Sequence, residues 1–284
     1  MAAPHLGLIL PNYGDALAAE RLARVAIAAE ESGFDSGWVT DHLIVPPEHA
    51  PIYGRIAEAL VSLGFLAGRT QKLQIGVSAL VVPQRNPLVV LKQLSTLDFL
   101  SGGRIVTAVA AGWMEGEFRL LGADFDHRGR VLNQWLELAR SPRMDPPFVR
   151  PGGPELWVAG VSRATLRRAA KTGVWHPVAL PPDELRTMAE ELREQRPDGR
   201  VMLRIGTYLQ DEPAPGTDER GRHAIAGPPD WIAEQLAEYM DAGCDGFVVN
   251  LDYEAPDLED RVRRFAEEVA PLLPATRGSS RPRG

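Results

Sequence analysis

Apolar residues along the chain follow two alternating patterns. Segments with apolar residues three and four positions apart predict amphipathic helices, and the short apolar runs between them predict buried strands. One phrase occurs three times, at 31–39, 171–176 and 241–249, where an amphipathic segment is followed by a glycine and a short apolar run. A glycine at that point permits the left-handed backbone that ends many helices. The repeated order of helix, glycine and strand is typical of α/β units around a parallel sheet.

The pattern predicts eight strands in strict alternation with helical regions. We expect strands at 6–10, 37–40, 73–77, 105–110, 156–159, 174–176, 201–209 and 246–251. We expect helices at 15–32, 55–70, 86–101, 115–121 with 128–139, 162–172, 182–195, 228–242 and 257–273. Eight such units close a (β/α)8 barrel, the TIM barrel. The prediction is therefore one α/β barrel domain over residues 1–274, followed by a disordered Gly/Ser/Arg/Pro tail over 275–284.

A doubly wound open sheet is the alternative arrangement for alternating strands and helices. It would carry a glycine-rich dinucleotide fingerprint after an early strand. The first predicted strand is followed instead by Pro11, Asn12, Tyr13 and Gly14, which do not form that motif. The barrel is therefore favoured.

Composition narrows the class of protein further. The 284 residues are 44% hydrophobic and 24% charged, as in globular proteins, and their net charge of −7 argues against nucleic acid as the main partner. No apolar run approaches the roughly 20 residues of a membrane span, and we expect no signal peptide because the first residues lack a basic region and an apolar segment. Cys244 is the only cysteine, so we expect a buried, unreactive thiol and a cytoplasmic location.

The residues just past each predicted strand are the candidates for a functional site, because in a barrel they converge on the catalytic face. They are Asn12 and Tyr13; Asp41 and His42; Ser78 and Ala79; Gly112, Trp113, Glu115 and Glu117; Gly160, Val161 and Ser162; His176; Tyr208 and Gln210; and Asn250, Asp252 and Tyr253. His42 is the first candidate proton donor, since histidine exchanges protons near neutral pH. Its alternative role is that of a buried polar residue, and Asp41 is expected to brace the neighbouring loop.

The predicted strand ends carry no lysine and no paired histidines, which disfavours two kinds of chemistry. The three lysines, Lys72, Lys92 and Lys171, all lie away from strand ends, so a Schiff-base aldolase has no nucleophile in place. The six histidines show no paired metal-ligand spacing, so we expect no metal site.

The segment from Gly160 to Ser162 predicts a turn between a strand and a helix, with Ser162 as the N-cap. Backbone N–H groups at Val161 and Ser162, together with the positive end of the helix, suit a phosphate group. An ordinary capped helix is the alternative.

Several longer segments of the sequence resemble one family, the luciferase-like flavin and deazaflavin oxidoreductases, and most closely its branch that uses coenzyme F420. The matching segments run in order from the first to the last predicted strand, so the resemblance covers nearly the whole chain. They are 7–11, 33–42, 75–87, 94–104, 111–113 with Glu117 and Phe118, 126–130 and 157–160.

The resemblance implies a cofactor site in the barrel mouth. The family places its ring cofactor over a bulge at the end of the third strand, which often contains a non-prolyl cis peptide, here between Ser78 and Ala79. Asp41 and His42 match the motif beside the ring, and Gly160, Val161 and Ser162 match the turn that holds the cofactor's phosphate. Gly112 and His176 are further expected cofactor contacts. Arg85, Arg163, Arg167 and Arg168 are candidates for contacts with the acidic tail of F420.

The expected function is transfer of a hydride between reduced F420 and a C=N or C=C bond of a small metabolite. A protein acid would supply the proton, with His42 first and Glu115 or Tyr13 next. One departure concerns the substrate: Trp113 stands where the sugar-phosphate dehydrogenases of the branch have a carboxylate, so sugar-phosphate oxidation is not expected.

Two alternatives stay open. One is an FMN-dependent monooxygenase of a two-component system, supplied by a separate flavin reductase. The other is a flavin- or deazaflavin-binding protein without turnover. Dimers are common in the family, so a homodimer is among the expected assemblies, and a reductase that supplies F420 or flavin is a candidate partner.

Overall fold

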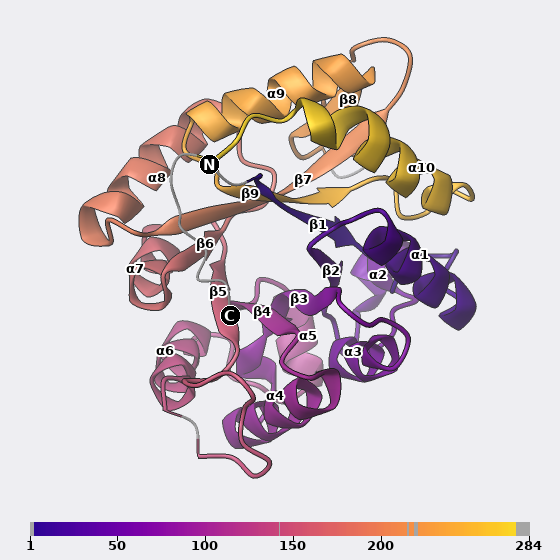
Figure 1. Ribbon diagram of the computed structural model, residues 1–284. Coiled ribbons are helices and arrows are strands. Elements are labelled where there is room, and N and C mark those ends of the chain that lie inside the picture. The colour runs from indigo at the N-terminus through magenta and orange to yellow at the C-terminus, as the bar shows by residue number, and fades with distance from the viewer. Residues whose placement is uncertain (1–2, 142, 215, 219–220, 277–284) are drawn as a thin grey trace. The chain divides into compact units, whose positions relative to one another are not determined.

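The computed structural model describes residues 3–141, 143–214, 216–218 and 221–276 (Figure 1). The chain forms two compact units. We call Leu10–Ile27 with Gly37–Ala159 the His42 unit, and Met1–Ile9, Ala28–Ser36 and Gly160–Gly284 the His176 unit. Two elements cross the boundary between these ranges, namely helix α1 (Ala19–Glu31) and strand β2 (Ser36–Val39).

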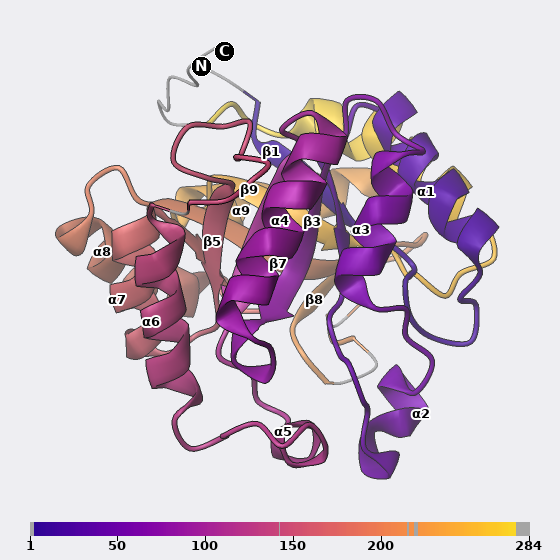
Figure 2. The same cartoon turned by 90° about the horizontal axis from the view of Figure 1, so that it is seen from below.

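The His42 unit is built on parallel strands covered by helices. Strand β4 (Ile105–Ala110) pairs in parallel with β3 (Gln74–Val81) and with β5 (Glu155–Ala159). The helices are α2 (Ala50–Tyr53), α3 (Ala59–Ala67), α4 (Pro87–Ser101), α5 (Glu115–Leu120) and α6 (Arg128–Ala139), with short 3-10 turns at Pro47–His49 and Val82–Gln84. Helices α3 and α4 pack side by side (Figure 2).

Tryptophans and one glycine set the packing at the centre of this unit. The rings of Trp38 and Trp157 lie 4.5 Å apart between centroids, and both side chains are buried. A Cβ atom on Gly76 would come within 2.4 Å of the Val106 carbonyl oxygen and 2.8 Å of the Trp38 ring. Glycine at position 76 therefore lets the tryptophan lie directly on the strand.

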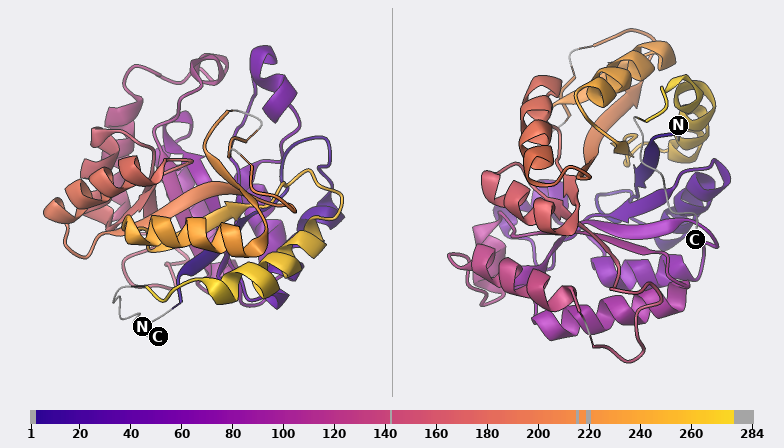
Figure 3. Two further views of the ribbon diagram at one scale, coloured as in Figure 1. Left: turned by 90° about the horizontal axis from the view of Figure 1, so that it is seen from above. Right: turned by 60° about the vertical axis from the view of Figure 1, so that its left-hand side comes forward.

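The His176 unit contains the remaining strands. Strand β9 (Gly246–Asn250) pairs in parallel with β1 (His5–Ile9) and β7 (Arg200–Leu209), and β7 also pairs in parallel with β6 (Val174–His176) and β8 (Ala224–Gly227). The helices are α7 (Arg163–Thr172), α8 (Pro182–Gln195), α9 (Pro229–Asp241) and α10 (Leu258–Arg264), and α10 continues through a π turn (Phe265–Val269) and a 3-10 turn (Ala270–Leu272). Helix α9 lies against β7 and β8 (Figure 3).

The repeated helix–glycine–strand phrase has the predicted conformation. Gly33, Gly173 and Gly243 have φ angles of +82°, +94° and +104°, in the left-handed region that ends a helix. Ser162 caps α7 as predicted, because its side chain accepts a hydrogen bond from the Thr165 N–H.

All eight predicted strands occur, as β1 to β7 and β9, and the structure adds a ninth strand and a short helix. The extra elements are β8 and α2, which are only four residues long. Helix α1 begins at Ala19 and α3 at Ala59, four residues later than the predicted positions 15 and 55. Helix α3 starts there because Glu58 is its N-cap and accepts from the Val61 N–H.

Three further expectations concern the chain as a whole. Cys244 is buried, and burial raises the pKa of its thiol to about 12, as expected for an unreactive cysteine. No helix in the described part of the chain is long and apolar enough to cross a membrane. Of the predicted disordered tail, Ala275 and Thr276 are placed and Thr276 is buried, whereas 277–284 lie outside the described residues.

Candidate active site

His42 and Glu117 form a buried pair in the His42 unit. The His42 Nδ1 atom lies 2.9 Å from Oε2 of Glu117, and the two side chains are 6% and 1% exposed. The other oxygen of Glu117 accepts hydrogen bonds from the backbone N–H groups of Leu43 at 2.5 Å and Ile44 at 3.3 Å. One carboxylate therefore holds both the histidine ring and the loop that follows it.

The electrostatics of the pair define the histidine tautomer. Burial alone would raise the pKa of Glu117, but hydrogen bonds from His42, Gln84 and the Leu43 N–H hold it below its usual value. An ionised carboxylate only accepts hydrogen bonds, so Nδ1 of His42 donates to Glu117. Nε2 is then the nitrogen available for proton transfer.

Helix α5 delivers Glu117 to the interior through its apolar face. Met114, Glu117 and Phe118 are buried, whereas Glu115 is exposed. This spacing of three and four residues is that of one helix face.

Asn12 fixes the end of β2 just before His42. Its side-chain amide donates to the Thr40 carbonyl and accepts from the Thr40 N–H.

Asp41 is fully occupied by its protein partners. Its carboxylate, 0% exposed, receives two hydrogen bonds from Arg85 at 2.7 and 2.9 Å and one from the Val81 N–H at 2.9 Å. Arg85 also binds Glu58 at 3.2 Å. Asp41 thus ties the loop after β2 to the end of β3, as expected of a brace. Arg85 is consumed in this network, so the structure gives it no place in a basic groove for an acidic tail.

The end of β3 carries the predicted irregularity. Its register with β4 shifts between Val77 and Leu80, and the Ser78–Ala79 peptide bond is cis. Ser78 and Leu80 are buried, whereas Ala79 between them is partly exposed. Ala79 is therefore the residue of the Ser78–Leu80 segment whose side chain is accessible.

Gly112 closes the neighbouring strand end. Its φ angle is +90°, and a Cβ atom there would lie 2.6 Å from Val81 and 2.7 Å from Phe118. Its carbonyl oxygen accepts a hydrogen bond from Nε of Arg128 at 3.1 Å. Only glycine fits this contact between the β3 end and helix α5.

Aromatic rings surround His42. The Tyr53 ring lies 4.5 Å from the His42 ring, and the Trp113 ring lies 6.2 Å from it in an edge-on arrangement. Trp113 also contacts His49, at 5.1 Å. Tyr53 was not among the predicted site residues, since it comes from the short helix α2 that no periodic pattern indicates.

The other two predicted proton donors are placed less favourably. Glu115 is 60% exposed at the start of α5 and pairs with Arg119 on the same helix at 3.0 Å. Tyr13 is buried and stacks on Tyr53 at 5.8 Å, with its backbone bridged to Ile56. The carboxylate beside His42 is therefore Glu117. It is among the strand-end residues, but Glu115 was the acid predicted as a proton donor instead.

The His176 unit holds the remaining predicted residues. Gly160 has a φ angle of +124°, and Val161 and Ser162 are exposed at the start of α7. His176 is 0% exposed, and its Nδ1 donates to the Met202 carbonyl oxygen. Burial lowers its pKa to about 3, so the ring is neutral. The ring is therefore enclosed by the protein and held by the neighbouring strand β7.

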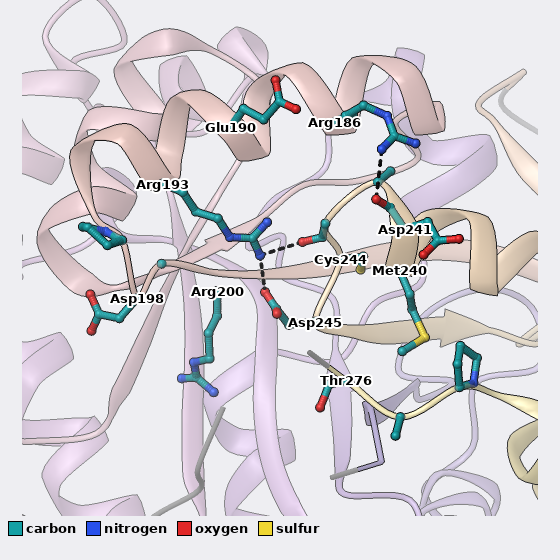
Figure 4. A pocket seen from close by; sticks show the side chains of 16 residues that line it. Arg186, Glu190, Arg193, Asp198, Arg200, Met240, Asp241, Cys244, Asp245 and Thr276 are labelled. Carbon is teal, nitrogen blue, oxygen red and sulfur yellow. Dashed lines mark hydrogen bonds and ion pairs between the residues drawn. The ribbon is translucent and has the colours of Figure 1, made fainter. Parts of the chain in front are cut away.

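A cavity of about 690 Å³ lies elsewhere in the His176 unit, at the surface formed by α8 and the loop before β9 (Figure 4). Arginines and acids line it, and Arg193 bonds both Asp245 and the Gly243 carbonyl oxygen. None of the predicted site residues lines this cavity. Among the described residues, no cluster of three or more His, Cys, Asp or Glu side chains is arranged to hold a metal ion.

The His42 unit thus combines a histidine oriented by a buried carboxylate with a strand-end bulge and an aromatic wall. Such an arrangement can exchange a proton at His42 Nε2 with a bound molecule. Histidine–carboxylate pairs of this kind are common in enzymes.

The chain belongs to the luciferase-like monooxygenase family, whose model matches residues 8–220. It is 25% identical over 182 residues to the alkanal monooxygenase alpha chain of Photorhabdus laumondii subsp. laumondii, covering 58% of this chain and 49% of that one. It is 35% identical over 123 residues to the F420-dependent glucose-6-phosphate dehydrogenase of Amycolatopsis mediterranei, covering 42% and 36%. The chain thus spans about half or less of the length of these curated relatives.

Solved structures show the fold. The coenzyme F420 dependent tetrahydromethanopterin reductase of Methanopyrus kandleri aligns with a TM-score of 0.75 at 15% identity, over 96% of this chain and 100% of that one. The oxygenating constituent of 3,6-diketocamphane monooxygenase of Pseudomonas putida, in complex with FMN, aligns with a TM-score of 0.76 at 14% identity, over 96% and 99%. The fold is therefore the luciferase-like (β/α)8 barrel, as predicted.

Proposed function

We propose that this protein is an oxidoreductase that uses coenzyme F420 to exchange a hydride with a C=N or C=C bond of a small metabolite. The observation that carries the proposal is the buried His42–Glu117 pair, tied through Asp41 to the β3 bulge. A second support is the 35% identity with an F420-dependent dehydrogenase over 123 residues.

Each unit by itself offers one feature that suits part of such a cofactor, and in the His42 unit this feature is the β3 bulge. Ala79 is the partly exposed residue of the bulge, so a planar ring can rest on its methyl group without displacing a larger side chain. In the His176 unit, taken by itself, Val161 and Ser162 lie exposed at the start of α7, with Ser162 as its N-cap. Phosphate oxygens accept hydrogen bonds from backbone N–H groups at a helix N-terminus. When bound, F420 would supply or accept the hydride.

His42 would manage the proton that accompanies the hydride. Reduction of a C=N bond adds a hydride to carbon and a proton to nitrogen, and a C=C bond gains the same two species on its two carbons. With Nδ1–H directed at Glu117 at 2.9 Å, the doubly protonated form of His42 would give its Nε2 proton, become the neutral ring, and later take a proton from solvent at Nε2. Glu117 acts through His42 by fixing its tautomer and orientation.

Asp41 would contribute indirectly. Its carboxylate is saturated by Arg85 and the Val81 N–H, so it holds the β3 end in place. Removing its charge would loosen the bulge that supports the cofactor. Gly112 would act in the same indirect way, because its backbone permits the contact between Val81 and Phe118.

Titration of the purified protein with F420 and, separately, with FMN tests the proposal. Cofactor fluorescence and the shift in thermal midpoint report binding. We expect a saturable response to F420 that is weakened by Ala79→Trp, which fills the space above the bulge. The matched control is Ala123→Trp, at a partly exposed alanine just after the turn that follows α5. Tight FMN binding with no response to F420 would overturn the proposal.

A second candidate, an FMN-dependent monooxygenase, is favoured by the family match and by the FMN-containing structural neighbour. It would need a separate reductase to supply reduced flavin. Oxygen consumption with supplied reduced FMN distinguishes it from F420-dependent hydride transfer.

A further inference from the structure

We infer that the exposed indole face of Trp113 is a stacking platform that selects planar, conjugated substrates for the site beside His42. The inference rests on the proposed function, since it names the class of substrate that His42 would protonate. Its physical basis is an exposed ring on a fixed backbone.

Trp113 is exposed, unlike four buried tryptophans of the chain. Its exposure is 57%, whereas that of Trp38, Trp135, Trp157 and Trp175 is 0–1%. Leaving an indole face in water forgoes the stabilisation that burial of a large apolar ring provides. An exposed ring beside a buried histidine–carboxylate pair therefore indicates a surface that a ligand covers.

The backbone that carries Trp113 is anchored on both sides. Gly112 before it is wedged between Val81 and Phe118 and bound to Arg128 through its carbonyl oxygen. Met114 after it is 2% exposed and leads directly into helix α5. The indole is therefore presented by a fixed main chain, so that binding a ligand does not require the chain to become ordered.

Neighbouring rings hold the indole in place beside the reactive histidine. His49 lies edge-on to it at 5.1 Å with an interplanar angle of 74°, and Tyr53 lies at 6.4 Å. His42 is 6.2 Å away at 88°. The contacts with His49 and Tyr53 hold Trp113 next to the His42 ring.

A flat π system is the ligand that gains most from such a wall. Stacked or edge-on aromatic pairs contribute beyond the area that they bury, and the contribution requires planarity. The proposed reaction also requires an electron-poor double bond, whose reacting atoms are planar. A conjugated substrate satisfies both demands, whereas a sugar phosphate offers no flat face. The cation beside the site, Arg85, is already bound by Asp41 and Glu58.

A pair of probes with the same carbon skeleton tests the inference. We would measure by calorimetry the Kd of 2-naphthol, which is planar, and of decahydro-2-naphthol, which is saturated and puckered, with the protein saturated by whichever cofactor it binds. We expect 2-naphthol to bind wild type more tightly. Trp113→Leu should weaken 2-naphthol about tenfold and leave decahydro-2-naphthol within about twofold, as expected from the roughly 1.4 kcal/mol upper range of aromatic pair energies. Trp113→Phe should retain most of the affinity.

The matched control is Phe99→Leu on α4, a ring with a nearly identical exposure of 58%. It should leave both Kd values unchanged. Equal loss of both probes in Trp113→Leu, or no preference of wild type for 2-naphthol, would overturn the inference. If F420 binds but Trp113→Leu has no effect, the stacking role fails alone. If neither cofactor binds but the planar preference depends on Trp113, the stacking role stands and the proposed function fails.

Discussion

Glu117 provides a sharp test of the site's architecture because its loss can be compared with that of Glu115, two residues away on the same helix. Glu117→Ala removes the acceptor of a buried hydrogen bond from His42 Nδ1 and of two part-buried hydrogen bonds from the Leu43 and Ile44 N–H groups. Each donor left without a partner costs about 1–3 kcal/mol. Allowing for partial relaxation, we expect a loss of about 4 kcal/mol in the free energy of unfolding.

Glu115→Ala changes the same charge in the same helix but breaks only an exposed pair, since Arg119 and Glu115 are 77% and 60% exposed. Pairs of that kind contribute well under about 1 kcal/mol. Urea unfolding followed by circular dichroism would give both values, and thermal midpoints should differ by roughly 10 °C between the variants. Equal stabilities of Glu117→Ala and Glu115→Ala would refute the hydrogen-bond network described for His42.

Three further predictions concern groups outside the His42–Glu117 pair. His176→Asn keeps a donor near the Met202 carbonyl but does not titrate. Because the His176 pKa falls from 6.5 to about 3 on folding, the wild-type free energy of unfolding is full above pH 6.5 and falls as the pH is lowered. In urea titrations between pH 4 and 6.5, the wild type should lose about 1.4 kcal/mol per pH unit more than the variant. Cys244 should react with a thiol reagent only at the rate of unfolding, because it is buried and its pKa is about 12, and rapid labelling of the native protein would contradict its burial. Asp41→Asn breaks a buried ion pair with Arg85 and should cost about 3–5 kcal/mol in urea unfolding, against no measurable change for the exposed Asp198→Asn.

The fold could be predicted from local signals because those signals are physical constraints on the backbone. Gly33, Gly173 and Gly243 mark helix ends, and each adopts the positive φ that the pattern requires. Short elements gave no such signal. Helix α2 and strand β8 are four residues each, too short for a period to appear, and β8 is held by pairing with the extension of β7.

The sequence predicted the cis bond at Ser78–Ala79 and the bracing contacts of Asp41, but it did not predict the buried partner of His42. Roles of these residues in binding or catalysis stay predictions. Glu115 was preferred to Glu117 as a reactive carboxylate, because position after a strand does not reveal which helix face is buried. The spacing of Met114, Glu117 and Phe118 would have shown it, since an acid on an apolar face must have a buried partner.

The most direct measurement of the proposed function is the oxidation of reduced F420 by a panel of C=N and C=C acceptors, followed by the return of deazaflavin fluorescence. We predict turnover by the wild type that falls by about 10²–10⁴-fold in His42→Gln with F420 affinity retained, the range for loss of a general acid. His127→Gln, at a histidine that is 55% exposed, should keep the wild-type rate. Full turnover in His42→Gln, or oxygen consumption with reduced FMN and no oxidation of reduced F420, would contradict it.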